Sequence, residues 1–201
     1  MTGPDISSIL IRNADHVLTM GDDRAELAGA DLRLRGGTIS EIGKGLARLP
    51  GEEVVDAAGC VVTPGLVNTH HHLYQSLTRA VPGAQAALLF GWLSRLYPIR
   101  AAFTPDHIFA STQVGLAELA LSGCTLSSDH LYIFPNGTRL EDTIHAAAEI
   151  GLRFQPTRGA MSIGESKGGL PPDALVEDEA AILEDCMRVV DAFHDPAPSS
   201  M

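Results

Sequence analysis

The sequence predicts an α/β fold, namely the N-terminal part of a (β/α)8 barrel preceded by a small β module. Residues 1–64 contain short β-patterned segments separated by turn signals. From Cys60 onward, continuous apolar runs typical of parallel strands alternate with helical patterns. This order indicates either a barrel or a doubly wound sheet. No Gly-rich phosphate fingerprint follows the first of these strands, which favours the barrel.

The first module consists of short predicted strands. Residues 9–20, 31–35, 38–43 and 53–56 carry the apolar patterns. Gly36 and Gly37 separate two alternating segments, and such a pair is typical of a tight hairpin turn. We place the boundary between the two domains at residues 64/65.

The pattern of residues 65–201 predicts alternating strands and helices. Thr104 precedes Pro105 and Asp106, which together form a helix-start signal, and Gly123 is placed to end that helix. The remaining predicted elements are strands at 60–68, 124–129 and 152–158, and helices at 140–150, ended by Gly151, and 173–194. The last helix has a predicted apolar stripe that comprises Leu175, Ile182, Leu183, Cys186, Val190 and Phe193.

The predicted barrel is shorter than a complete one. An eightfold barrel takes about 250 residues, whereas residues 65–201 have room for about three βα units. We therefore expect the chain to be truncated after those units.

Composition excludes several classes of protein. The net charge is −11 and no Lys/Arg cluster is present, which excludes nucleic-acid binding. The sequence has no signal-peptide pattern and no apolar run long enough to span a membrane. Cys60, Cys124 and Cys186 lie far apart within apolar runs, so we interpret them as reduced, buried thiols of a cytoplasmic protein.

The candidate chemistry is concentrated at Asn68-Thr69-His70-His71-His72. In a strand, His70 and His72 share one face and His71 points the other way. Two imidazoles at the carboxyl end of a barrel strand can be neighbouring ligands of one metal ion. The spacing alone is equally compatible with a structural pair.

The surrounding residues resemble a known family. Residues 64–72, Pro-Gly-Leu-Val-Asn-Thr-His-His-His, are similar to the Pro-Gly-apolar-apolar-Asp-x-His-x-His signature of the amidohydrolase superfamily, although Asn68 replaces the commoner Asp. The likeness continues through residues 70–80, 122–125, 128–132 and 152–159, and together these segments most resemble the 8-oxoguanine deaminases, with hydroxyatrazine ethylaminohydrolases as relatives.

This resemblance implies a TIM barrel that follows a β-sandwich segment, and one divalent metal ion, Zn²⁺ or Fe²⁺, bound by His70 and His72. It also implies hydrolytic deamination of an N-heterocycle, with 8-oxoguanine converted to urate and ammonia. The remaining ligands and the catalytic acid and base are expected beyond Met201. A homo-oligomer is left open for the full-length form.

Five further residues are candidate substrate contacts, each beside a structural alternative. Gln75 is a candidate reader of a purine edge, and its alternative is a loop hydrogen bond. Trp92 is a candidate stacking residue or a core aromatic. Asp129 and His130 stand at the carboxyl end of a predicted strand on the catalytic face and are candidates to hydrogen-bond the substrate or neighbouring groups, and the alternative is a buried histidine satisfied within the protein. Arg158 is a candidate bidentate donor or a member of a structural salt bridge.

Two alternatives to a deaminase compete at the level of function. One is a non-catalytic fragment whose His pair is structural. The other is one half of a split enzyme that a second polypeptide completes. Within the enzyme hypothesis, an ethylaminohydrolase of the hydroxyatrazine type or another N-heterocycle aminohydrolase is the alternative activity.

Overall fold

The computed structural model describes residues 8–195. The chain divides into two compact units, residues 1–64 and residues 65–201.

The first unit contains two small sheets. One has the strand order β5-β4-β1-β6 and the other the order β3-β2-β7. The strands are β1 Ser8–Arg12, β2 His16–Leu18, β3 Glu26–Ala28, β4 Asp31–Arg35, β5 Thr38–Gly43, β6 Glu53–Asp56 and β7 Val61–Val62. Both sheets contribute to one apolar cluster, in which Val17 of β2 and Ile11 of β1 take part. The two sheets therefore share a core.

The predicted hairpin is present, whereas the predicted strand over residues 9–20 is divided. Strands β4 and β5 pair antiparallel around Gly36 and Gly37, whose φ values of 55° and 76° fit a tight hairpin turn. Residues 9–20 break into β1 and β2 at Asn13, where φ is 62°. The amide of Asn13 donates to Asp31 Oδ1 at 2.9 Å, so a tertiary contact ends the strand.

A buried ion pair links β4 to Glu52, the residue that precedes β6. Arg33 Nε donates to Glu52 Oε1 at 2.7 Å, and Ser8 Oγ donates to the same oxygen at 2.6 Å. The Glu52 side chain is fully buried. The hydrogen bond from Arg33 holds the pKa of Glu52 down at about 2, against the opposing effect of burial.

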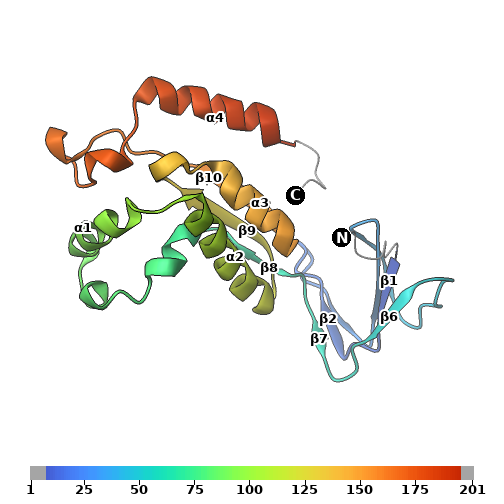
Figure 1. Cartoon of the computed structure of the whole chain (residues 1–201). Helices are drawn as coiled ribbons and strands as arrows, with labels where there is room; N and C mark the ends of the chain where they lie inside the picture. Colours follow the sequence, from blue (N-terminus) through green and yellow to red (C-terminus); the bar gives the residue numbers. More distant parts are fainter. Residues whose placement is uncertain (1–7, 196–201) are drawn as a thin grey trace. The chain divides into compact units, whose positions relative to one another are not determined.

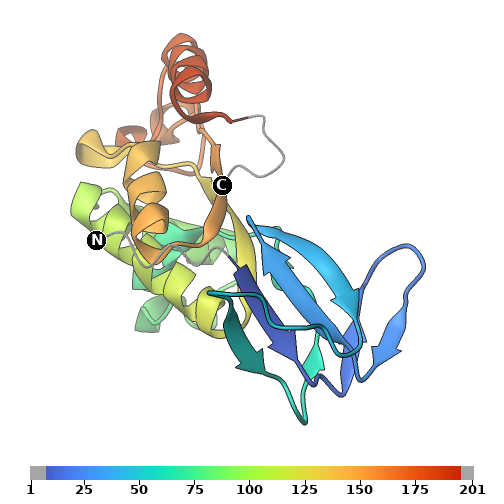
Figure 2. The ribbon, with the colours of Figure 1, turned by 90° about the vertical axis from the view of Figure 1, so that its right-hand side faces the viewer.

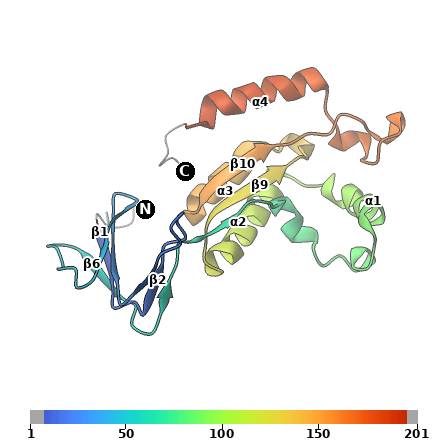
Figure 3. The ribbon, with the colours of Figure 1, turned by 180° about the vertical axis from the view of Figure 1, so that it is seen from behind.

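The second unit is built on a parallel sheet with the order β10-β9-β8. Its strands are β8 Leu66–Asn68, β9 Cys124–Leu131 and β10 Arg153–Arg158. Helices α2, Pro105–Leu121, and α3, Leu140–Ile150, cover one face of this sheet (Figures 1 and 3). Residues of η1, a 3-10 segment at Leu73–Thr78, pack in the same core.

Local sequence signals determine where α2 and α3 begin and end. Thr104 and His107 form a capping box at the start of α2, and Gly123 follows the helix with φ of 87°. Helix α3 has the predicted bounds and ends at Gly151, which adopts the left-handed conformation of a C-terminal cap.

Two helices differ from the prediction. Helix α1, Leu89–Arg100, has no counterpart in the sequence-based prediction and lies toward the carboxyl ends of the strands (Figures 1 and 3). The final helix begins later than predicted: α4 spans Glu179–Phe193, because Asp178 accepts hydrogen bonds from the amides of Ala180 and Ala181 as its N-cap.

The apolar stripe expected on the last helix is exposed at three of its six residues, Leu183, Val190 and Phe193. Val189 is the buried residue of α4, while Leu183 and Val190 are 68% and 50% exposed. Helix α4 lies on the β10 side of the unit (Figures 1 and 2). The buried residue Val189 was not in the predicted stripe, whereas Ile182 and Cys186 of the stripe are half-buried and Leu175 is buried in a separate 3-10 segment, Asp173–Leu175, so the predicted face is covered in part.

The cysteine prediction is wrong at one position. Cys60 is exposed, Cys124 is buried and Cys186 is half-buried, and all three are free thiols. Among residues 8–195, no helix is long and apolar enough to cross a membrane.

Candidate metal centre

The three consecutive histidines lie directly after β8. The strand ends at Asn68 and the 3-10 segment η1 begins at Leu73, so alternation of strand faces does not govern this segment. The His70 and His72 ring centroids are nevertheless 5.1 Å apart, with the rings nearly perpendicular. The two imidazoles are neighbours at the carboxyl end of the strand.

A backbone contact determines which nitrogen of His72 is available. His72 Nδ1 lies 2.8 Å from the carbonyl oxygen of His130. A carbonyl oxygen only accepts, so Nδ1 carries a proton, and in the neutral ring Nε2 then retains its lone pair. Metal-binding histidines are commonly oriented by such a hydrogen bond to the opposite ring nitrogen.

His71 also contacts His130, through its backbone carbonyl. The His71 carbonyl accepts from the amide of His130 at 2.9 Å. The His71 ring has a buried Nδ1 that lacks a hydrogen-bond partner in the described residues. Burial, followed by the neighbouring rings of His72 and His70, lowers the pKa of His71. These effects favour the neutral ring.

Asp129, which the sequence paired with His130 as a candidate for polar contacts at the end of the strand, binds a backbone amide beside the histidines. Its Oδ1 accepts from the amide of Leu73 at 2.7 Å, while Oδ2 is buried without a partner in the described residues. Asp129 is completely buried. Burial raises the pKa of its carboxyl group to about 7, although the amides of Leu73 and His130 oppose that change.

Tyr132 also joins the cluster, and the sequence analysis missed it. Its ring lies 5.2 Å from that of His72 and 5.3 Å from that of His130. Gln75 Nε2 donates to the hydroxyl groups of Tyr132 at 3.3 Å and Tyr74 at 3.2 Å. The available signal was position, because Tyr132 lies two residues beyond His130 along an extended segment.

Trp92 lies on α1, and a cation occupies one of its faces. The guanidinium carbon of Arg100 is 4.6 Å from the Trp92 ring centroid and 5.2 Å from that of Tyr74. Arg100 is completely buried and donates from Nε and Nη2 to Thr78 Oγ1. Its Nη1 has no hydrogen-bond partner in the described residues.

Arg158 forms structural salt bridges, which was the alternative to a role in substrate binding. Its Nη2 lies 2.5 Å from Glu177 Oε1, its Nε lies 2.9 Å from Asp185 Oδ2, and Nη1 donates to the carbonyl of Gly159. The guanidinium carbon also lies 4.2 Å from the Phe134 ring centroid. All three nitrogens are thus engaged within the protein.

The residues present fit a divalent metal ion as two of its ligands. His70 and His72 are adjacent, and the tautomer of His72 leaves Nε2 able to coordinate. A catalytic zinc site takes about three protein ligands and a water position. The part of the chain that the structure describes contains no group of three His, Cys, Asp or Glu side chains able to hold a metal ion.

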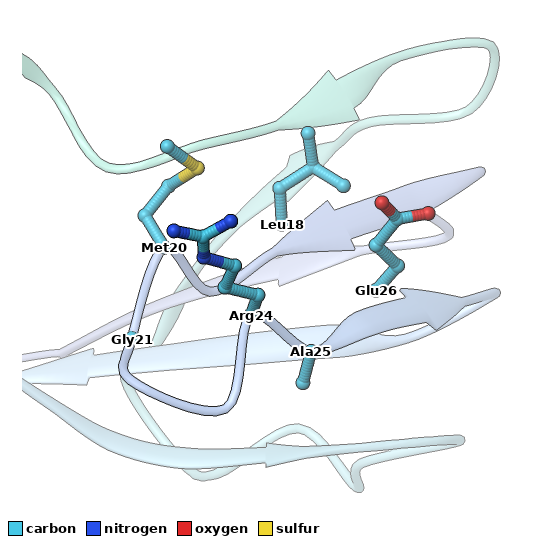
Figure 4. Close-up of a pocket in the computed structure, with 6 residues that line it drawn as sticks. All are labelled: Leu18, Met20, Gly21, Arg24, Ala25 and Glu26. Carbon is cyan, nitrogen blue, oxygen red and sulfur yellow. The ribbon is translucent and has the colours of Figure 1, made fainter.

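The surface has one hollow beside the histidines and another in the first unit. A hollow of about 330 Å³ is lined by all three histidines together with Gln75, Ser76, Arg79 and Glu118. Another of about 410 Å³ lies in the first unit, beside the turn between β2 and β3 (Figure 4). Figure 4 shows Arg24 extending toward Met20 there, and Arg24 and Glu26 are its only charged lining residues. The first hollow contains the candidate ligands.

Comparison with known proteins identifies the family of the chain. A model described as the amidohydrolase family matches residues 61–198. The chain belongs to the amidohydrolase family. This agrees with the similarity of residues 64–72 to the signature of that superfamily.

Curated relatives of this amidohydrolase chain are deaminases and aminohydrolases. An 8-oxoguanine deaminase from Pseudomonas aeruginosa is 50% identical over 143 residues, which cover 69% of this chain and 31% of that protein. A hydroxydechloroatrazine ethylaminohydrolase from Pseudomonas sp. strain ADP is 37% identical over 201 residues, covering 92% of this chain and 42% of that protein. The chain thus spans less than half the length of these relatives.

A solved structure supports the same assignment. An atrazine chlorohydrolase from Arthrobacter aurescens, complexed with zinc, matches with a TM-score of 0.86 and 32% identity, covering 94% of this chain and 44% of that one. Similarity to zinc-bound members of the family agrees with the donor set of His70 and His72.

Proposed function

We propose that this chain is the N-terminal part of a metal-dependent hydrolytic deaminase that acts on an oxidised purine, with 8-oxoguanine as the substrate. The observation that carries the proposal is the His70–His72 pair, whose rings are 5.1 Å apart with His72 Nε2 left free. The 50% identity to an 8-oxoguanine deaminase supports the choice of substrate.

The proposed fold is a (β/α)8 barrel that residues 65–201 begin and residues 1–64 precede as a small β-sandwich domain. The three parallel strands and the helices on one face of the sheet support this architecture. Within it, His70 and His72 would hold Zn²⁺, or Fe²⁺ as the alternative. A metal ion bound there would lower the pKa of a coordinated water toward about 7.

The chain's own residues would prepare the site for that chemistry. The His130 carbonyl keeps the His72 proton on Nδ1, and Gln75 and Tyr132 present polar groups beside the His72 ring. An amide and a hydroxyl together can both donate to and accept from the alternating N–H and C=O groups of an oxopurine. These residues would therefore orient the heterocycle. The proposal gives Arg158 no direct contact with the substrate.

The test uses the protein as its native host produces it. Purified protein is incubated separately with 8-oxoguanine, with a hydroxyatrazine and with isoxanthopterin, for which a 38% identical deaminase is named, and release of ammonia or ethylamine is measured. We expect ammonia and urate from 8-oxoguanine. Selective ethylamine release from the hydroxyatrazine would replace the proposed substrate with the alternative one, and release of neither amine from any of the three would contradict an aminohydrolase.

Metal content tests the ligand assignment separately. His70→Ala and His72→Ala should each remove most of the bound metal, whereas His71→Ala should retain it. Metal analysis by mass spectrometry gives the readout. Equal metal loss in His70→Ala and His71→Ala would contradict the assignment.

A second candidate is a split enzyme in which another polypeptide supplies the remaining ligands. The observation that favours it is that the described residues gather no three-ligand group. The intact mass of the native protein distinguishes the two. A mass well above 21.2 kDa supports a single longer enzyme, whereas a mass of 21.2 kDa with a co-purifying partner supports the split form. The same mass without a partner supports a non-catalytic protein.

A further inference from the structure

The backbone around His72 is held in an unusual way. His72 has φ of −132° and ψ of 78°, which belongs to neither a helix nor a strand, and its carbonyl accepts from the amide of Gln75 at 2.9 Å where η1 begins. The peptide groups on both sides of it are hydrogen-bonded. The carbonyl of His71 accepts from the amide of His130, and the amide of Leu73 donates to Asp129 Oδ1.

Both partners come from two consecutive residues at the end of β9. Asp129 holds the peptide group that follows His72, His130 holds the one that precedes it, and the His130 carbonyl holds the ring through Nδ1. The three distances are 2.7, 2.9 and 2.8 Å. The backbone and the ring of His72 are therefore fixed together by one short segment.

Of these three hydrogen bonds, only the one between the Leu73 amide and Asp129 uses a side chain that is not a histidine. We propose that Asp129 is a positioning residue for His72, fixing through the Leu73 amide the orientation in which His72 presents Nε2 to a metal ion. This inference rests on the proposed role of His72 as a ligand. Asp129 is completely buried and its Oδ1 accepts from the Leu73 amide, so the side chain is held against the segment that carries His72.

The inference is tested on metal-free protein, prepared by chelator dialysis of the native-host product. Histidine ¹⁵N NMR reports the His72 tautomer, and competition with a fluorescent chelator reports Zn²⁺ affinity. Asp129→Ala should convert the Nδ1–H form of His72 to a mixture of tautomers and weaken Zn²⁺ binding by about 10–100-fold. Asp129→Asn retains an acceptor for the Leu73 amide and should stay within about threefold of the wild type.

Thr143→Val is the matched control. Thr143 is completely buried and its hydroxyl donates to the Leu140 carbonyl in α3, so this variant also removes a buried hydrogen bond, but its hydrogen bond does not involve the histidines. It should leave the tautomer and the Zn²⁺ affinity unchanged. An Asp129→Ala protein with the wild-type tautomer and affinity overturns the inference.

A measurement on the wild type keeps the inference testable if Asp129→Ala does not fold. The Leu73 amide should exchange slowly with solvent, and His72 Nδ1 should show a scalar coupling across its hydrogen bond to the His130 carbonyl carbon. Absence of either signal overturns the inference. None of these readouts involves a substrate, so a protein that passes them but releases no ammonia contradicts only the proposed function.

Discussion

The guanidinium carbon of Arg100 lies 4.6 Å from the centroid of the Trp92 ring. This contact occupies a face of the aromatic side chain that the sequence marked as a candidate for stacking on a heterocycle. Arg100 is completely buried, and burial lowers its pKa. The contact makes Trp92 part of the wall around a buried cation and leaves at most its other face for a substrate.

Replacement of Arg100 separates the contribution of its charge from that of its packing. Arg100→Met keeps a long side chain, and the free energy of unfolding should stay within about 1 kcal/mol, because loss of the desolvation cost offsets loss of two cation–π contacts and of the hydrogen bonds to Thr78. Arg100→Ala should lose about 2–5 kcal/mol through the cavity it leaves. Urea denaturation measures both. If Arg100→Met lowered the free energy of unfolding as much as Arg100→Ala does, the charge itself would be required.

Gly159 provides space for His130. A Cβ atom at this position would lie 2.3 Å from His130 Nε2 and 2.8 Å from Tyr132 Cβ. Gly159→Ala should therefore displace the His130 ring and lower the free energy of unfolding by about 1–3 kcal/mol. Thermal denaturation and a crystal structure of the variant check both expectations.

Gly91 is the matched control for that substitution. It lies inside α1, and a Cβ atom there would have Ala87 Cβ as its nearest contact at 3.8 Å. Gly91→Ala should raise the free energy of unfolding by about 0.5–1 kcal/mol through helix propensity. A destabilisation comparable to that of Gly159→Ala would show that steric crowding at Gly159 is not the cause.

Arg158 should contribute to stability through its two carboxylate partners. Arg158→Met leaves Glu177 and Asp185 without this cation, and the free energy of unfolding should fall by about 2–4 kcal/mol. Calorimetry provides the measurement. Arg79→Met is the control, because Arg79 and Glu118 are more than half exposed and their ion pair should contribute less than about 1 kcal/mol. Similar effects of the two substitutions would contradict the structural role of Arg158.

Glu52 should make the first unit sensitive to acid. Its pKa is lowered from 4.5 to about 2 in the folded protein, so the folded state binds the proton less readily than the unfolded state. The stabilisation from its pair with Arg33 is therefore complete above about pH 4.5 and is lost as the pH falls toward 2. Amide exchange of residues 8–62 between pH 5 and 2 monitors the loss. Glu52→Gln should flatten this pH dependence, and an unchanged slope would point to other carboxylates.

Local sequence signals predicted much of the fold. Thr104 predicted the start of α2 and Gly151 the end of α3, because caps depend on residues within one helical turn. The start of α4 was placed too early because its N-cap is Asp178, inside a run of acidic residues that gives no clear boundary signal. Helix α1 was missed, and Gly91 and Pro98 lie within it.

The candidate site was predictable only in part, because some of its residues meet through contacts between segments far apart in the sequence. The motif at residues 68–72 identified His70 and His72 because the chemistry of two nearby imidazoles is encoded by adjacent residues. The contribution of Asp129 and Tyr132 depends on parallel pairing between β8 and β9, whose residues are nearly 60 positions apart. No local pattern reports such a contact.

The sequence by itself therefore determined the family motif, the alternation of strands and helices and the candidate metal ligands, since each depends on short-range spacing and side-chain chemistry. Only the tertiary structure decided that His130 orients His72, that Arg158 is engaged in ion pairs and that Arg100 covers Trp92. These relationships arise when packing brings distant segments within a few ångströms, where hydrogen bonds and ion pairs form between groups that the sequence separates.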